Sequence, residues 1–301
     1  MAVLRRLSDG VELPVPSRLL IGRSSACGLR LRAAPASNEH ASMAWTGVAW
    51  ELRDLGSRNG TLLDRERLEP GQPKRVARGA ALVFGAPEET WTLVDDAPPG
   101  AIALDVEAQH AVPARGGLIA LPSPEQVLVS VFRSAQGEWV AESADGDVTP
   151  VLDQETLKVA GRAFRLFLPL DLEGTPMVEP GPTLATVQFR FAVSKNEELV
   201  DIELVHRGRT IRLESREHGY VLLTLARQRQ ADAELSVGER GWLDRDELLR
   251  MLSMDANGLN VAIHRARQQL LAAGVDGAQG IVEVRRGHRR FGTDRFEIHE
   301  L

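Results

Sequence analysis

Short runs of alternating hydrophobic and polar residues, separated by turn-forming residues, fill the first third of the chain. They occur at 18–23, 28–32, 41–45, 48–55, 61–64 and 81–85. Alternation with a period of two is typical of strands that bury one face. Gly, Pro, Asn and Asp between the runs favour tight turns. Residues 1–95 are therefore predicted to form an all-β sandwich of short strands.

The middle of the chain has the same period but no cluster of charged or histidine side chains that would mark a site. Its strand-like runs lie at 126–133, 137–147, 156–161 and 163–169. Residues 96–168 are therefore predicted to be a small β-rich extension that provides packing or spacing. Residues 169–186 are rich in Pro and Gly and are predicted to be a linker.

The pattern changes period in residues 187–301. Strand-like runs at 186–193, 199–208 and 209–214 are followed by helical spacing at 215–230, 244–252 and 257–274, and by a predicted hairpin at 280–298. Asp244 with Glu247 three residues later indicates a capping box, and Gly274 indicates a helix stop. The order predicts an α+β domain.

Charge distribution adds a second feature to this plan. Residues 96–186 hold 5 basic and 13 acidic residues, a net charge of −8, within a chain whose net charge is −6. The single cysteine, Cys27, excludes a disulfide framework. The N-terminus lacks the apolar segment of a signal peptide, and no apolar run is long enough to span a membrane. We therefore expect a cytoplasmic protein without membrane partners.

Three separated motifs lie in the first block. They read IGRSS at 21–25, SNEHA at 37–41 and GSRNGT at 56–61. In order and approximate spacing they resemble the forkhead-associated (FHA) domain family. The resemblance covers about residues 1–95 and implies a β-sandwich whose loops at one end bind phosphothreonine peptides.

Carried over from that family, Arg23 and Ser37 would hold the phosphate, with Asn38 beside them, although many members have Arg at this last position. Asn59 would hold the peptide backbone and Arg58 would touch the peptide or its phosphate. The loop-shaping residues would be Gly22, His40, Ser57 and Gly60. The physical logic agrees, because a phosphate dianion needs charge-assisted donors in fixed geometry. The alternative is an ordinary solvated hairpin tip.

The last predicted helix has one apolar stripe and no acidic residue between 256 and 275. The stripe comprises Leu259, Ile263, Ala266 and Leu270. The opposite face carries Asn257, Val261, His264, Arg265 and Gln268, flanked by Asn260 and Arg267. Such a face suits the major groove of DNA, where Arg contacts guanine and Asn or Gln contacts adenine.

Residues 198–298 resemble the OmpR-type winged-helix DNA-binding domain of bacterial response regulators. The resemblance implies that 257–268 lies on the recognition helix and that Arg285, Arg286 and Arg290 lie on the wing, near double-stranded DNA. The sequence departs from the family at His288-Arg289, where Gly-Tyr is usual, and at Ala266, where Leu is usual. The alternative is a winged helix used for protein contacts.

No catalytic or cofactor motif occurs, and the seven histidines have no metal-ligand spacing, so we expect neither an enzyme nor a metal or cofactor protein. The sequence predicts a regulator that couples Ser/Thr kinase signalling to transcription. Its phosphothreonine ligand would belong to a partner or to its own linker, at Thr175 or Thr183. The alternative is a signalling adaptor whose two end domains both bind proteins. The oligomeric state is not predicted.

Overall fold

The computed structural model of the chain describes residues 1–134, 136–169, 181–195 and 199–300. These residues divide into two compact units. The N-terminal unit contains 1–114 and 152–174, and the C-terminal unit contains 115–151 and 175–301. The predicted extension 96–168 therefore does not form one block, because its two ends belong to one unit and its centre to the other. Most of the predicted linker, 170–180, lies outside the described residues.

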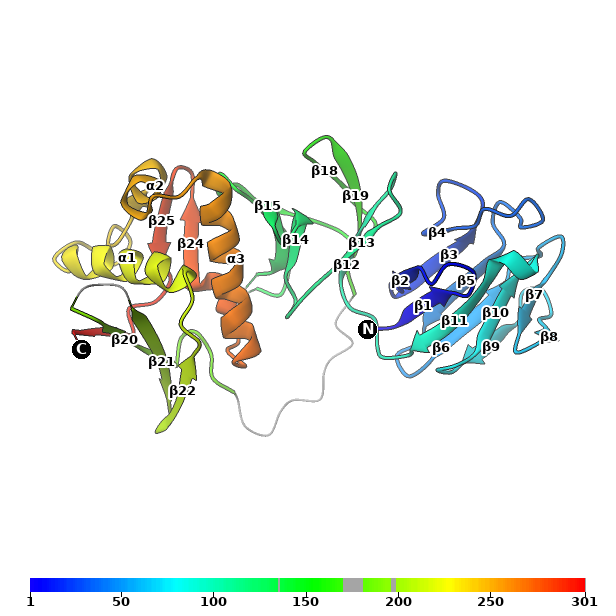
Figure 1. Cartoon of the computed structure of the whole chain (residues 1–301), viewed down its shortest axis with the longest axis horizontal. Coiled ribbons are helices and arrows are strands. Elements are labelled where there is room, and N and C mark those ends of the chain that lie inside the picture. Colours follow the sequence, from blue (N-terminus) through cyan, green and yellow to red (C-terminus); the bar gives the residue numbers. More distant parts are fainter. Residues whose placement is uncertain (135, 170–180, 196–198, 301) are drawn as a thin grey trace. The chain divides into compact units, whose positions relative to one another are not determined.

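Two sheets form the sandwich of the N-terminal unit (Figure 1). Trp50, Trp91 and Phe84 fill its core and are at most 1% exposed. One sheet has the order β2 (Glu12–Pro14), β1 (Val3–Arg6), β11 (Thr90–Asp95), β10 (Ala81–Phe84), β7 (Thr61–Leu63) and β8 (Glu66–Arg67). The other has the order β4 (Leu29–Arg30), β3 (Arg18–Gly22), β5 (Ala41–Trp45), β6 (Trp50–Asp54) and β9 (Pro73–Val76). The strand pairs of these two sheets are antiparallel except for β3 and β4, which pair in parallel. The predicted all-β sandwich is confirmed.

A third sheet extends the core of this unit. Its order is β13 (Ala111–Pro113), β12 (Ile102–Asp105), β19 (Arg162–Phe167) and β18 (Thr156–Val159). Ile102, Leu104 and Phe167 belong to the same buried cluster as the sandwich residues. A short 3-10 helix, Pro87–Glu89, precedes β11.

Three helices and two small sheets form the body of the C-terminal unit. The helices are α1 (His218–Ala231), α2 (Arg245–Leu252) and α3 (Ala256–Ala272). One sheet has the order β22 (Arg209–Leu213), β21 (Val200–His206), β20 (Gln188–Val193) and β26 (Phe296–Glu300), and the other β23 (Leu243–Asp244), β25 (His288–Phe291) and β24 (Val282–Arg285). A 3-10 helix, Ala278–Ile281, precedes β24.

Two local predictions in this unit have clear outcomes. The Asp244 side chain accepts hydrogen bonds from the backbone N–H groups of Asp246 and Glu247, so Asp244 is the N-cap of α2 as predicted. The predicted hairpin at 280–298 is wrong in its last part, since it consists only of β24 and β25. Strand β26 instead pairs in parallel with β20, where Phe296 and Ile298 pack against the core.

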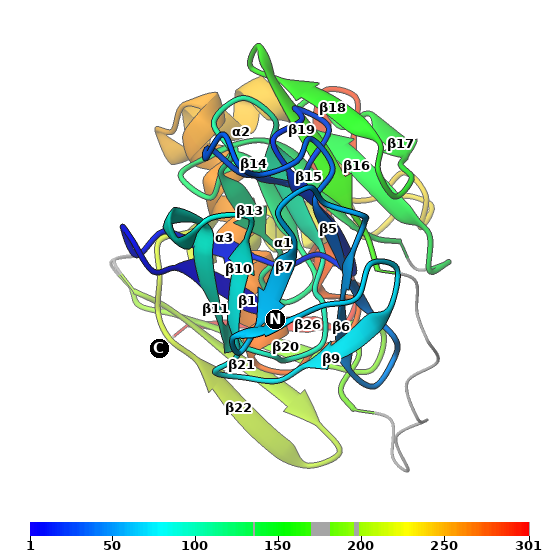
Figure 2. The same cartoon turned by 90° about the vertical axis from the view of Figure 1, so that its right-hand side faces the viewer.

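A further antiparallel sheet belongs to the C-terminal unit. It contains β14 (Ile119–Ser123), β15 (Gln126–Arg133), β16 (Trp139–Ser143) and β17 (Val148–Pro150), which lie side by side in Figure 2. We call residues 115–151 the cover, because strands β14 and β15 lie against α3 (Figure 1). In the described ranges, no helix combines the length and the apolar composition needed to cross a bilayer.

Candidate functional site

Three loops meet at one end of the sandwich, after β3, before β5 and after β6. The backbone N–H of Arg23 donates to Ser37 O at 3.0 Å and that of Ser24 donates to Asn38 O at 3.1 Å, which joins the first two loops. The N–H of Arg58 donates to the Ser37 Oγ at 3.1 Å, which joins the third. The motifs found in the sequence, far apart in the chain, therefore form one continuous surface.

The polar side chains of this surface are held at one end and open at the other. The Arg23 Nε donates to Ala36 O at 2.6 Å, while its terminal nitrogens have no partner among the described residues. Ser37 Oγ accepts from Arg58, so its hydroxyl hydrogen stays available. The Asn59 Nδ2 donates to Pro35 O at 2.7 Å. The side chains of Arg23, Asn38, Arg58 and Asn59 are exposed. The surface can offer donors to an anion.

His40 lies beneath these loops and is fully buried. Its Nδ1 accepts from the Ser37 N–H at 3.0 Å, so its Nε2 carries the proton and donates to Gly60 O at 3.1 Å. Burial lowers the pKa of His40, although the bond to Gly60 and the nearby Asp54 act in the other direction. The neutral ring therefore connects the loop at 37 to the turn at 60.

Asp54, at the end of β6, organises the turn that carries Ser57, Arg58 and Asn59. One carboxylate oxygen accepts from the N–H groups of Gly56 and Ser57, each at 2.8 Å, and the other from the hydroxyls of Ser57 and Thr61, each at 2.6 Å. Burial alone would raise the Asp54 pKa, but these hydrogen bonds outweigh it and lower the pKa. Sequence analysis missed this residue, although an Asp directly before a turn is a recognised signal.

Gly22 allows the first two loops to approach each other closely. A Cβ at this position would lie 2.1 Å from the Asn38 backbone oxygen. Gly22→Ala is therefore expected to separate the loops, destabilise the unit by about 1–3 kcal/mol and weaken any ligand held between Arg23 and Ser37. Position 60 requires glycine for a different reason. Its φ is +82°, a conformation that glycine adopts without the steric cost of a Cβ.

Thermal unfolding and ligand titration of Gly22→Ala measure this effect, with Gly10→Ala as the control. No atom lies within 4 Å of a Cβ at Gly10, so that change costs only the backbone strain of its φ of +71°. Unaltered ligand affinity in Gly22→Ala would contradict the role given to the close approach.

The buried thiol of Cys27 packs under the same loops. Its Sγ lies 3.3 Å from Asn38 O, and burial raises the pKa of the thiol. This environment favours a packing role over a reactive one. Within the described ranges, no three His, Cys, Asp or Glu side chains gather as a metal site.

The predicted nucleic-acid face of α3 is only partly open. The apolar stripe is buried as predicted, with Leu259, Ile263, Ala266 and Leu270 at most 5% exposed. The opposite face was expected to face solvent, and here the expectation is wrong for three of its predicted contacts: Val261, His264 and Arg267 are 8%, 5% and 1% exposed. The reason is tertiary, since the cover packs on them.

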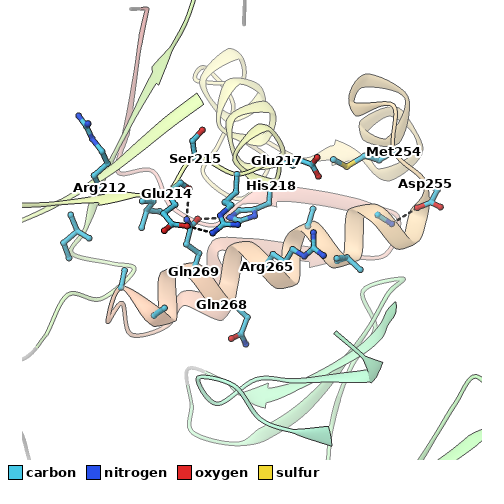
Figure 3. A pocket seen from close by; sticks show the side chains of 18 residues that line it. Arg212, Glu214, Ser215, Glu217, His218, Met254, Asp255, Arg265, Gln268 and Gln269 are labelled. Atoms are coloured by element: carbon cyan, nitrogen blue, oxygen red, sulfur yellow. Dashed lines mark hydrogen bonds and ion pairs between the residues drawn. The ribbon is translucent and has the colours of Figure 1, made fainter. Parts of the chain in front are cut away.

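Arg265 keeps an exposed position beside a groove of about 1260 Å³. The groove lies between α3 and the segment that joins β22 to α1, as Figure 3 shows. His218 Nε2 lies 2.7 Å from the Gln269 Oε1 across it, and burial lowers the pKa of His218. Gln268 points away from His218, toward the cover. Sequence analysis did not single out His218.

The arginines of the predicted wing have three different environments. Arg285 and Arg290 lie over the Trp242 ring, at 4.1 and 4.5 Å from its centroid, and Arg290 also pairs with Glu283. Arg286 is exposed at the hairpin turn. Arg289, by contrast, is 1% exposed and donates to the backbone oxygens of His288 and of Ala144 in the cover. Arg286 is therefore the predicted wing residue with the freest side chain.

Comparison with known proteins identifies the class of the first domain. The family model of the FHA domain matches residues 19–85, the part that holds all three loops. The chain therefore contains an FHA domain at these residues.

Among curated proteins, the chain is similar to the FHA domain-containing protein FhaB of Mycobacterium tuberculosis, in strains CDC 1551 / Oshkosh and H37Rv. The identity is 40% over 68 residues, which covers 21% of this chain and 44% of the relative. The chain thus spans less than half the length of the curated relatives that it matches.

Several solved structures also resemble this region, among them two phosphopeptide complexes. One is Mycobacterium tuberculosis EmbR in complex with a low-affinity phosphopeptide, with 24% identity, a TM-score of 0.30, and coverage of 32% of this chain and 25% of that one. The other is the N-terminal FHA domain of S. cerevisiae Rad53p with a phosphothreonine peptide, with 18% identity, a TM-score of 0.27, and coverage of 31% and 89%.

Proposed function

We propose that the FHA domain binds a phosphothreonine-containing segment of another protein through Arg23, Ser37, Asn38, Arg58 and Asn59. The observation that carries this proposal is the joining of three loops by Ser37, whose backbone oxygen accepts from Arg23 and whose Oγ accepts from Arg58. The two arginines and the serine hydroxyl then provide donors to one phosphate. The role is phosphoprotein recognition in signalling, and the chain needs no catalytic group for it.

Fluorescence anisotropy of the full chain against a phosphothreonine peptide library tests the proposal. We expect selection of some sequences, and no binding of the same peptides without phosphate. Phosphoserine versions separate recognition of the threonine methyl group from attraction by charge alone. Equal affinity for phosphorylated and plain peptides would exclude the proposed pocket.

A second candidate function, DNA binding by residues 187–301 as a winged helix, is supported by the order of elements. Helices α2 and α3 follow each other closely, and the hairpin of β24 and β25 comes next and pairs with β23. Residues 256–275, which include α3, contain no carboxylate, and the hairpin carries Arg285, Arg286 and Arg290 beside a single carboxylate, Glu283. The proposed contacts that stay at least partly exposed are Asn257, Asn260, Arg265, Gln268, Arg285, Arg286 and Arg290.

Arg286→Ala tests that function at an exposed position. We expect weaker binding to most duplex sequences alike and a salt dependence that is flatter by about one unit of slope, because one phosphate contact is lost. Arg209→Ala, an exposed arginine at the start of β22, is the matched control. Anisotropy at several salt concentrations provides the measurement. Identical slopes in wild type and Arg286→Ala would exclude this hairpin contact.

Together, these two activities would make the chain a transcription regulator that responds to a Ser/Thr kinase. In the alternative function, the chain is a signalling adaptor whose two end domains both bind proteins. The second proposed source of the phosphothreonine is the linker of the chain itself. Thr175 lies outside the described residues, whereas the Thr183 hydroxyl lies 3.1 Å from the Thr186 hydroxyl in a turn. Phosphorylation of Thr183 would have to disrupt that turn.

A further inference from the structure

The cover contacts the surface that the second proposed function assigns to DNA. Ala120 and Val127 of the cover form a buried cluster with Val261 of α3. A second cluster joins Leu118, Phe132 and Val140 to Leu271. The turn after β16 also approaches the hairpin, since a Cβ at Gly146 would lie 2.6 Å from Val284. One small sheet thus covers both the helix and the hairpin.

Six side chains of the C-terminal unit donate hydrogen bonds to the cover among the described residues. Asn257 and Gln268 donate to the backbone oxygens of Glu125 and Arg115, at 3.2 and 2.6 Å. Arg267 and Arg245 donate to the carboxylates of Glu142 and Asp145, at 2.8 and 2.7 Å, and Arg289 and Gln279 donate to the oxygens of Ala144 and Arg133. In each case the cover provides the acceptor.

This direction is the chemistry that a nucleic acid would present. Phosphate oxygens and the N7, O6 and O4 atoms of bases are acceptors on the surface of duplex DNA. The carbonyl and carboxylate oxygens of the cover occupy equivalent roles toward Asn257, Arg267 and Gln268. The cover also lies in the acidic middle of the sequence.

The same interface buries polar atoms without full compensation. The Nδ1 of His264, the Oδ1 of Asn257 and the Nε atoms of Arg267 and Arg289 have no hydrogen-bond partner among the described residues. Burying such atoms destabilises an interface relative to an apolar one of the same size. An interface of this kind is easier to open than a hydrophobic core.

We infer that the cover is a displaceable intramolecular competitor, which occupies the face formed by α3 and the hairpin and gives way to double-stranded DNA. The inference rests on the proposed DNA-binding function and adds its regulation. Residues 114 and 152, at the two ends of the cover, belong to the unit that holds the FHA domain. The unit that would bind the phosphoprotein is therefore covalently connected to both ends of the cover.

Glu142→Arg in the full chain tests the inference, because it places a like charge against the buried Arg267. We expect binding to a random-sequence DNA duplex about 5–150-fold tighter than that of wild type, the range of typical allosteric coupling. Glu138→Arg is the matched control, since it makes the same charge change at an exposed turn of the same sheet. Asp145→Arg, also exposed, is a milder second variant should Glu142→Arg fold poorly.

His264 reports opening without any DNA. Burial lowers its pKa to about 4, as do Arg267, Arg115 and Arg265, while Glu125 acts in the other direction. In Glu142→Arg the pKa should rise toward its ordinary value near 6.5, because displacement of the cover removes Arg115 and exposes the ring to water. An NMR titration of the histidine ring signals, assigned with His264→Gln, measures this.

Each outcome of these measurements either supports or overturns the inference that the cover is displaceable. A raised His264 pKa together with tighter DNA binding in Glu142→Arg, but not in Glu138→Arg, supports the inference. An unchanged His264 pKa in both Glu142→Arg and Asp145→Arg overturns the inference, because the cover is then a fixed part of the core. If wild type binds DNA as tightly as the opened variant, the inference fails and DNA binding stands. If the opened variant does not bind DNA either, the proposed DNA-binding function fails as well.

Discussion

Arg23→Ala is expected to reduce affinity for a phosphothreonine peptide by roughly 30-fold to several thousand-fold. Its Nε is held by Ala36 O, which orients the terminal nitrogens of the guanidinium toward solvent beside Ser37. Loss of one partner from a desolvated charge pair costs about 2–5 kcal/mol, and each 1.4 kcal/mol is a factor of ten. Arg23→Lys should recover only part of the affinity, because lysine lacks the planar fork.

Titration of full-length variants with a labelled phosphopeptide measures this loss. Arg78→Ala is the matched control: it is exposed and follows β9, whose Val76 pairs with Trp50 at the start of β6, the end opposite the turn at 56–60. That control should bind as wild type does. If Arg23→Ala retains wild-type affinity, phosphate recognition is not at this pocket.

Asp54→Ala is expected to destabilise the loop region by at least about 3 kcal/mol and to remove peptide binding with it. Hydrogen bonds to a charged group are worth about 1.5–3 kcal/mol each, and Asp54 accepts two short ones from the hydroxyls of Ser57 and Thr61. Thr61 is fully buried, so its hydroxyl would lose its acceptor without gaining water. Hydrogen exchange of the segment 40–61, followed by mass spectrometry, measures the local opening free energy.

Asp96→Ala is the control, since within the described residues that exposed carboxylate accepts a single backbone hydrogen bond, from the N–H of Arg78 at 3.2 Å. The lowered pKa of Asp54 also predicts acid sensitivity. Its stabilising contribution is complete above the unfolded-state value of about 3.8 and is lost as pH falls through the lower folded-state pKa. Asp54→Asn should abolish this part of the pH dependence. Wild-type exchange rates in Asp54→Ala would refute the role of the carboxylate.

The strands that border the proposed phosphopeptide loops, β3, β5 and β6, were predictable, because each alternates clearly and turn-forming residues separate them. Strands β1, β2, β8, β9 and β11 of the sandwich were missed. Several of their pairing partners lie far away in the sequence, as for β1 and β11, although Leu4 and Trp91 are core residues. Backbone pairing of this kind leaves little signal in a local pattern.

The sequence by itself determined the residue types of the proposed phosphate site and their order, since phosphate recognition requires charged and hydroxyl donors in fixed geometry. It could not reveal that Asp54 holds the turn or that His40 connects two loops, because both act across loops that only folding brings together. It also determined that α3 has one apolar stripe. Only the tertiary structure decided whether the opposite face of α3 is exposed or buried. Residues 115–151 belong to the C-terminal unit, although the residues before and after them in sequence belong to the other unit. They pack on Val261, His264 and Arg267, because a small sheet has to bury its apolar side and α3 provides the surface.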